Sequence, residues 1–278
     1  HKDLDGVASS IIISNLYKNV EYVGLKYGEV NKFLEQLDFS KYDVVLLTDI
    51  SPESIEVFSL SNKLFLLDHH DTALQYHSPE NNRLVVHGIC AAKFVKEFYE
   101  EVFGVVLSYL NEFVTVINDY DMWILDDPRS WCMNELYFKY WDTNFRIRFK
   151  GGNLKFTEQE LGFIKCRRKL LLENYNALEL YDFDSINGTL IIANSFVNDM
   201  TNRLLREKNY DVVCCYNTKS MHVSVRTKCP NHHIGNMLRG VFGQGSGGHQ
   251  MAGAFSVKSY EELDEKLEML ENYIKENW

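Results

Sequence analysis

Short apolar runs alternate with helical patterns through the first half of the chain. The predicted strands are 20–27, 43–48, 63–68 and 84–87. Few polar residues interrupt these runs, as in strands of a parallel sheet whose two faces are both covered. The predicted helices are 7–17, 30–37, 52–60, 91–103 and 106–118. This alternation predicts a doubly wound α/β sheet, in which ligands bind beyond the carboxyl ends of the strands.

A second alternation follows a long helical stretch at 156–180. Its predicted elements are strands at 189–193, 211–216 and 222–227 and helices at 197–208 and 234–241. A last helix begins after Ser259, because Glu262 follows three residues later and completes a capping box. We therefore predict an N-terminal α/β domain with a parallel sheet at 1–150, a helical linker at 151–185, and a smaller α/β domain at 186–278. The active-site cleft is expected between the two domains.

Composition and charge limit the class of substrate and the expected location of the protein. The 29 Lys and Arg residues against 39 Asp and Glu residues give a net charge of −10. This balance disfavours coating of long nucleic acids but permits a short anionic substrate held by metal ions. The six cysteines show no CxxC pair, so we expect reduced structural thiols. Since no secretory signal opens the chain and no apolar run reaches about 18 residues, we expect a cytoplasmic protein without membrane contact.

Acidic and histidine side chains gather where an open sheet presents its ligands. The set comprises His1, Asp3 and Asp5 before the first helix, Asp49 and Asp68-His69-His70 directly after strands, and Asp119 after a later helix. Taken alone, an aspartate after a strand often caps a helix. Together, such carboxylates repel one another unless cations neutralise them, and carboxylate with imidazole suits manganese, iron, zinc or magnesium. Asp49 is placed to bridge two metals, and two metals can support a phosphoryl displacement.

These motifs resemble those of the DHH phosphoesterase superfamily. The resemblance implies two divalent metal ions, usually manganese, with magnesium as the alternative. The implied ligand sets are His1, Asp3 and Asp49 for one ion, and Asp5, Asp49, His69 and Asp119 for the other. It also implies that His70 contacts the scissile phosphate and that Asp68 orients a histidine. Asp49, Asp68 and His70 are therefore the expected catalytic residues.

The C-terminal half carries a second part of the resemblance. Residues 245–254 read Gly-Ser-Gly-Gly-His-Gln-Met-Ala-Gly-Ala, which is similar to the glycine-rich histidine motif of the first type of DHH-associated domain. Glycines let backbone N–H groups approach an anion closely. The resemblance implies that Gly247, Gly248 and His249 bind substrate, with Ser224 and Arg226 as further phosphate or nucleotide contacts.

The resemblance implies phosphodiester hydrolysis, and size and charge favour short substrates. We expect short single-stranded oligonucleotides or linear dinucleotides to be cut to nucleoside monophosphates. A RecJ-like exonuclease acting on single-stranded DNA stays open, as does a cyclic-dinucleotide or small-nucleotide phosphatase. The glycine-histidine motif argues against a pyrophosphatase, and the complete ligand set argues against a non-catalytic metal-binding module.

Three features leave further alternatives open. The basic residues at 165–169 would favour longer strands if they line the cleft. A homodimer is compatible with the sequence. The aromatic residues of the middle segment, Trp123, Trp131 and Trp141 among them, predict core packing, with base stacking as the alternative.

Overall fold

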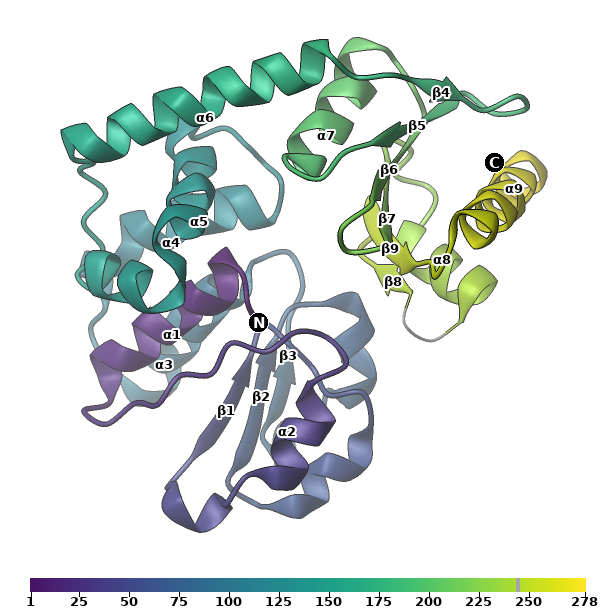
Figure 1. Ribbon diagram of the computed structural model, residues 1–278. Helices are drawn as coiled ribbons and strands as arrows, with labels where there is room; N and C mark the ends of the chain where they lie inside the picture. Colours follow the sequence, from purple (N-terminus) through teal and green to yellow (C-terminus); the bar gives the residue numbers. More distant parts are fainter. Residues whose placement is uncertain (244–245) are drawn as a thin grey trace. The chain divides into compact units, whose positions relative to one another are not determined.

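The computed structural model describes residues 1–243 and 246–278, and it divides into two compact units, His1–Lys165 and Cys166–Trp278 (Figure 1). Each unit combines strands with helices, which confirms the predicted α/β class. Helix α6 (Glu158–Asn176) contains the division between the units, so the predicted linker at 151–185 contributes residues to both.

The N-terminal unit is built on a parallel sheet, as predicted, with three of the four predicted strands. Its strands are β1 (Val45–Thr48), β2 (Leu64–Asp68) and β3 (Arg83–Val85), in that order. Thr48 pairs with Leu67 and Asp68 pairs with Val85. Because all three strands run the same way, the residues that follow β1 and β2 emerge at one edge of the sheet.

Two apolar clusters cover the two faces of this sheet (Figure 1). The larger core joins α1 (Leu4–Leu16), α3 (Ala91–Phe103), α4 (Asn111–Asp121) and α5 (Pro128–Phe149). The smaller one joins α2 (Val30–Gln36) to the strands. The 3-10 helices of this unit are Phe39–Lys41, Ile55–Leu60, Asp71–Tyr76, Pro79–Asn81 and Ser108–Leu110. Burial of Leu66 and Leu67 on opposite faces accounts for the unbroken apolar run of β2.

One strand prediction in this unit is wrong, and one helix was not predicted. Within the described chain, 20–27 pairs with no strand, although its residues are apolar enough for one. Its partly buried side chains Val20, Tyr22 and Leu25 pack on the helical cores instead of entering the sheet. The 22-residue helix α5 was not predicted, because its apolar and polar residues follow no single stripe.

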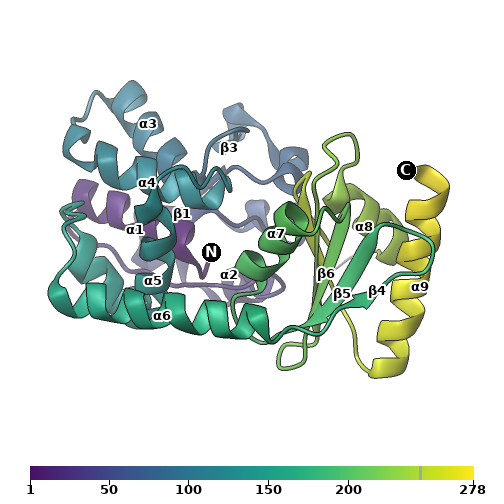
Figure 2. The same ribbon diagram turned by 90° about the horizontal axis from the view of Figure 1, so that it is seen from above.

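The C-terminal unit contains a six-stranded sheet with the order β4-β5-β6-β7-β9-β8. The strands are β4 (Tyr181–Asp182), β5 (Gly188–Ile192), β6 (Val212–Asn217), β7 (His222–Thr227), β8 (Gly247–Gly248) and β9 (Ala252–Ser256). Among the described strands of this second sheet, only β5 and β6 pair in parallel. Figure 2 shows α7 (Val197–Glu207) on one face and α8 (Ile234–Phe242) with α9 (Tyr260–Asn277) on the other.

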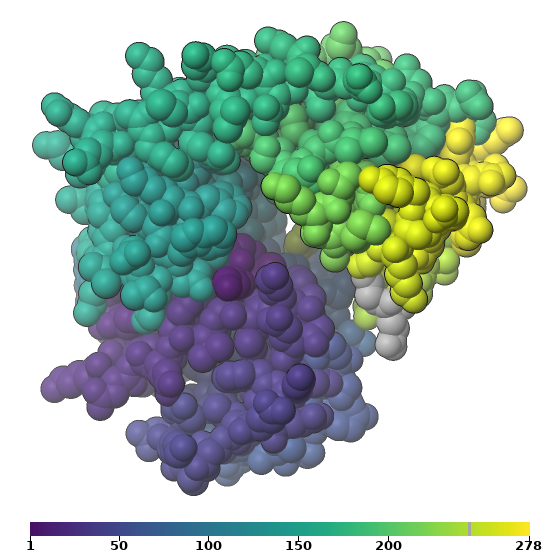
Figure 3. Space-filling model, in the orientation of Figure 1, coloured from purple at the N-terminus to yellow at the C-terminus, as the bar shows by residue number. Residues whose placement is uncertain are grey.

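Helix α9 confirms the predicted start of the last helix. The Ser259 side chain accepts a hydrogen bond from the N–H of Glu262. Leu263, Leu267 and Leu270 are buried in the core that α9 shares with β6, β7 and α8. The opposite side of α9, yellow in Figure 3, forms part of the surface. In the described ranges, no helix has the length and apolarity needed to cross a membrane.

Candidate functional site

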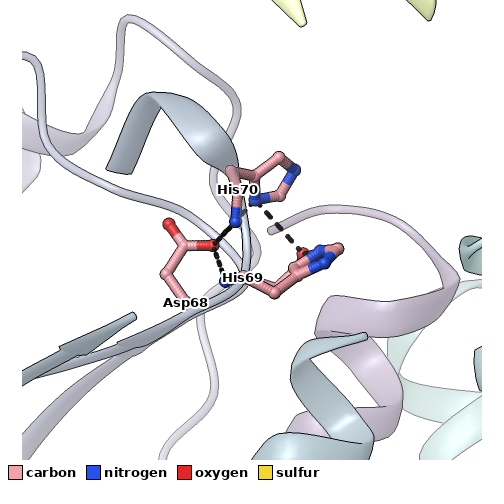
Figure 4. A group of neighbouring side chains, drawn as sticks. Asp68, His69 and His70 are labelled. Atoms are coloured by element: carbon pink, nitrogen blue, oxygen red, sulfur yellow. Dashed lines mark hydrogen bonds and ion pairs between the residues drawn. The ribbon is translucent and has the colours of Figure 1, made fainter. Parts of the chain in front are cut away.

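The loop after β2 is fixed by Asp68, the last residue of the strand. Asp68 Oδ1 accepts hydrogen bonds from the backbone N–H of His69 at 2.7 Å and of His70 at 3.3 Å. The same oxygen lies 2.7 Å from Nδ1 of His70 (Figure 4). Asp68 is completely buried. It therefore orients both the loop and the His70 ring, which is the arrangement expected of a carboxylate that supports a ligand.

Asp49 follows β1 in a left-handed conformation, with φ at 60°. Such a conformation is uncommon outside glycine, asparagine and aspartate, and it concentrates at functional sites. The Asp49 N–H still continues the ladder by donating to the carbonyl of Leu67 at 3.2 Å. The turn directs a buried carboxylate toward the imidazole of His69, with Oδ1 of Asp49 3.2 Å from Nε2.

Residues 1–5 do not form an extended loop, in which the side chains of residues 1, 3 and 5 would point the same way, because α1 already begins at Leu4. Asp3 is the N-cap of α1 and accepts from the N–H of Gly6 at 3.0 Å, while Asp5 lies in the first helical turn. A Cβ at Gly6 would lie 2.2 Å from the carbonyl oxygen of His1, so only glycine permits this tight approach. The His1 ring is hydrogen-bonded to Asp3 and lies 3.9 Å from Oδ2 of Asp49.

These side chains form three overlapping groups that could hold cations. The groups are His1 with Asp3 and Asp49; Asp49 with Asp68, His69 and His70; and Asp5 with His69 and Asp121. Asp49 and His69 each belong to two of them. Nε2 of His69 lies 3.5 Å from Oδ2 of Asp121 and 3.8 Å from Oδ2 of Asp5. Residues from four separate parts of the sequence therefore meet at the strand edge.

Asp119, the predicted fourth ligand, is not in these groups. Its two carboxylate oxygens accept hydrogen bonds from the N–H groups of Asp126 at 3.0 Å and Asp127 at 3.2 Å, which hold the loop after α4. Residues 119 and 121 lie about 200° apart around a helix, so only one of them can face His69. We correct the assignment to Asp121, whose Oδ2 lies 3.5 Å from Nε2 of His69. The only sequence signal for Asp121 is that it lies two residues after Asp119.

The carboxylates of this edge raise one another's affinity for protons. Burial raises the pKa of Asp49 well above its usual value, and the charges of Asp3 and Asp5 add to the effect. Burial likewise raises the pKa of Asp121, reinforced by the charge of Asp5. Cations would relieve this repulsion and stabilise the ionised carboxylates.

The two histidines are tuned in opposite directions. Burial lowers the pKa of His69, which favours the neutral imidazole that metals bind. Burial also opposes protonation of His70, but the charge and hydrogen bond of Asp68 outweigh it and raise the pKa of His70. His70 is thus the better donor toward an anion.

Unused oxygen atoms show that the edge fits divalent cations. Oδ2 of Asp49 and Oδ2 of Asp121 are buried, and neither makes a hydrogen bond within the part of the chain that is described. Buried carboxylate oxygens normally have partners. Together with the neutral His69 imidazole, these oxygens supply the hard oxygen and nitrogen donors suited to manganese, magnesium or zinc.

The predicted substrate residues on β7 and β8 lie on two strands that both pair with β9. Ser224 and Arg226 are two residues apart on β7 and share one face of the sheet. Their partners lie on β9, where Ser224 pairs with Ala254 and Arg226 pairs with Ala252. Ser224 and Arg226 therefore lie one strand away from the glycine segment, because β9 pairs with β7 on one side and with β8 on the other.

The glycine segment itself is held by close backbone packing. Gly247 and Gly248 form β8, whereas Gly245 of the predicted motif lies outside the described residues. A Cβ at Gly248 would lie 2.3 Å from the carbonyl oxygen of Ala252. The N–H of His249 donates to that same oxygen at 2.7 Å, and His249 is exposed. Glycine is therefore required here by the close approach of the strands.

Comparison with known proteins identifies the C-terminal unit directly. Residues 191–276 match the DHHA1 domain family. The chain is 24% identical over 147 residues to a 3',5'-cyclic-nucleotide phosphodiesterase of Helicobacter pylori (strain ATCC 700392 / 26695). That match spans 44% of this chain and 42% of the relative, less than half of its length.

Two solved structures share the fold along almost the whole chain. The pGpG-specific phosphodiesterase PggH from Vibrio cholerae superimposes with a TM-score of 0.57 at 13% identity, covering 100% of this chain and 98% of that one. RecJ from Thermus thermophilus in complex with Mn²⁺ gives a TM-score of 0.59 at 14% identity, covering 98% and 50%. The family match shows that the C-terminal part of the chain contains a DHHA1 domain, and the two structures show that the chain is similar in fold to a pGpG-specific phosphodiesterase and to RecJ.

Proposed function

We propose that the chain is a divalent-metal-dependent phosphodiesterase that cuts linear dinucleotides or short single-stranded oligonucleotides to nucleoside monophosphates. The observation that carries the proposal is the meeting of Asp49 and His69 with four further carboxylates at one strand edge. The likeness to a pGpG-specific phosphodiesterase along the whole chain supports a short substrate, as does the net charge of −10.

The proposed ligands divide between two ions that share Asp49. His1 and Asp3 would complete one set, and Asp5, His69 and Asp121 would complete the other. When bound, such ions lower the pKa of a water molecule and neutralise charge on a phosphoryl group. Manganese is the proposed metal, with magnesium as the alternative.

His70 and Asp68 have separate proposed tasks. The protonated His70 ring would donate to an oxygen of the scissile phosphate, since Asp68 raises its pKa and fixes its orientation. On the DHHA1 domain, His249, Ser224 and Arg226 would bind the phosphate or sugar of the substrate, with Gly247 and Gly248 shaping the adjacent backbone.

The test uses purified protein stripped with a chelator and then supplied with Mn²⁺ or Mg²⁺. Its substrates are pGpG, short RNA, long single-stranded DNA and pyrophosphate. We expect nucleoside monophosphates from pGpG and short RNA, and loss of about 99% or more of this activity in Asp49→Asn. Asp43→Asn, an exposed carboxylate just before β1, is the matched control and should keep full activity. Hydrolysis of pyrophosphate alone would refute the proposal, and preference for long DNA would favour a RecJ-like exonuclease.

A further inference from the structure

Trp141 interrupts α5 with a backbone conformation that side chains rarely adopt. Its φ of 55° and ψ of 178° lie close to a region that is nearly exclusive to glycine. The indole is 56% exposed, so burial does not compensate for the strain. Trp123 and Trp131 differ, because both pack partly buried against the N-terminal core. Core packing therefore accounts for those two residues and not for Trp141.

The residues on either side lock Trp141 in place. The Tyr140 hydroxyl donates to Glu160 at 2.9 Å, and Oδ1 of Asp142 accepts from the Tyr137 hydroxyl at 2.9 Å. The indole meets the ring of Tyr137 in an edge arrangement at 6.2 Å. Strain held by such anchors at an exposed aromatic residue is typical of a binding position.

The indole lines a hollow of about 380 Å³ in the N-terminal unit. The hollow is lined by Lys2, Tyr140, Trp141, Asp142, Thr143 and Asn144. Lys2 stands between His1 and Asp3, so its backbone is tied to the candidate metal centre on both sides. Lys2 is exposed and forms no ion pair with any described residue.

Gly24 lies against both the Asp142 carboxylate and the aliphatic part of the Lys2 side chain in this hollow. A Cβ at Gly24 would lie 2.9 Å from Oδ2 of Asp142 and 3.3 Å from Cγ of Lys2. The hollow thus offers an aromatic ring, an acceptor and a cation, beside a site that is proposed to act on phosphodiesters. Aromatic rings stack on nucleobases, and a carboxylate can accept N–H donors from a base edge.

We propose that this hollow binds one nucleobase of the substrate and prefers guanine. The base would stack on Trp141, Asp142 would accept from its edge, and Lys2 would face the adjoining phosphate. Guanine presents two neighbouring N–H donors on that edge, whereas uracil presents one, so a carboxylate distinguishes them. This inference rests on the proposed function, because it places a base of the same substrate beside the same centre.

Binding of GMP and UMP to the full chain in the presence of a chelator tests the proposal without requiring hydrolysis. We expect GMP to bind more tightly than UMP, and Trp141→Leu to weaken GMP binding about tenfold or more. Trp141→Phe should retain most of the affinity, and Asp142→Asn should remove most of the preference for GMP. The matched control is Phe103→Leu, which alters a 61% exposed aromatic residue at the end of α3 and should bind as the wild type does.

Trp141→Gly separates a binding role from a packing role. Glycine adopts this conformation freely, so the melting temperature should stay the same or rise while GMP binding is lost. A fall of several degrees would show that the indole stabilises the fold and would overturn the proposal. Unchanged GMP binding in Trp141→Leu would also overturn it, whether or not the protein hydrolyses pGpG. Loss of pGpG hydrolysis with intact GMP preference would instead count against the proposed function alone.

Discussion

Asp119 and Asp121 are two residues apart, yet their substitution should have opposite consequences. Asp119 accepts two backbone N–H bonds that hold the loop after α4. A hydrogen bond to a charged group contributes about 1.5–3 kcal/mol, so Asp119→Ala should cost about 3 kcal/mol or more in unfolding free energy. At about 2–4 °C per kcal/mol for a unit of this size, its melting temperature should fall by about 6–12 °C.

Asp121→Asn should leave the metal-free protein at least as stable as the wild type. The Asp121 carboxylate is held among other negative charges, and its neutral replacement removes that repulsion. The loss should appear on adding metal. At an ion concentration about 100 times the dissociation constant, binding stabilises the folded state by about 2.7 kcal/mol, and this gain should shrink or vanish in Asp121→Asn.

Thermal unfolding with and without Mn²⁺, together with metal analysis of the dialysed proteins, distinguishes the two residues. We expect Asp119→Ala to unfold earlier but to retain a metal-dependent rise in melting temperature. We expect Asp121→Asn to unfold no earlier than the wild type without metal, and to lose most of the metal-dependent rise in melting temperature. If Asp119→Ala lost the metal response while Asp121→Asn kept it, the correction from Asp119 to Asp121 would be wrong.

Three further predictions concern the binding loop and the stability of the N-terminal unit. Gly248→Ala should raise KM for pGpG about tenfold or more, because its Cβ would collide with a backbone oxygen 2.3 Å away. Gly240→Ala in α8 is the control, because a Cβ there meets open space and should leave KM unchanged. Equal KM values in the two variants would contradict the role of the glycine segment in binding. His249→Ala should raise KM with little change in metal content, measured by elemental analysis, and lost metal would refute this division of labour. Burial opposes ionisation of Glu160, but hydrogen bonds from Arg148, the Thr157 N–H and Tyr140 together outweigh it and lower the pKa of Glu160 from 4.5 to about 2. That shift corresponds to about 3 kcal/mol of stability. This stabilisation is present above pH 4.5 and is lost as the pH falls toward 2. In denaturant unfolding, Glu160→Gln should therefore have a lower free energy of unfolding than the wild type at pH 7 and a nearly equal one at pH 2.

The parallel sheet and the motif positions could be predicted from sequence because both depend on local patterns. An apolar run followed by Asp68 or Asp49 defines a strand and its carboxyl end, and parallel pairing brings those ends together. The capping box at Ser259 is similarly local. The predicted metal ligands other than Asp119 fall in the three groups for that reason.

The remaining features depend on tertiary contacts that local patterns do not encode. The choice between Asp119 and Asp121 depends on which side of α4 faces His69. The strained turn at Trp141 divides α5 into two parts whose apolar residues follow different directions, so no single helical stripe is visible. Residues 20–27 have strand-like composition but form no ladder with the edge strand β1, because their partly buried side chains pack on the apolar clusters instead.

Asp5 serves two neighbours at once, and this double use links the strand edge to the helical core. Its oxygens accept the N–H groups of Ala91 at 2.7 Å and Ala92 at 2.9 Å, while Oδ2 also lies 3.8 Å from the His69 ring. A cation drawn to Oδ2 competes with the first turn of α3 for the same lone pairs. Hydrogen–deuterium exchange at those two amides should therefore report whether the centre is loaded, at a position that touches neither ion nor nucleotide.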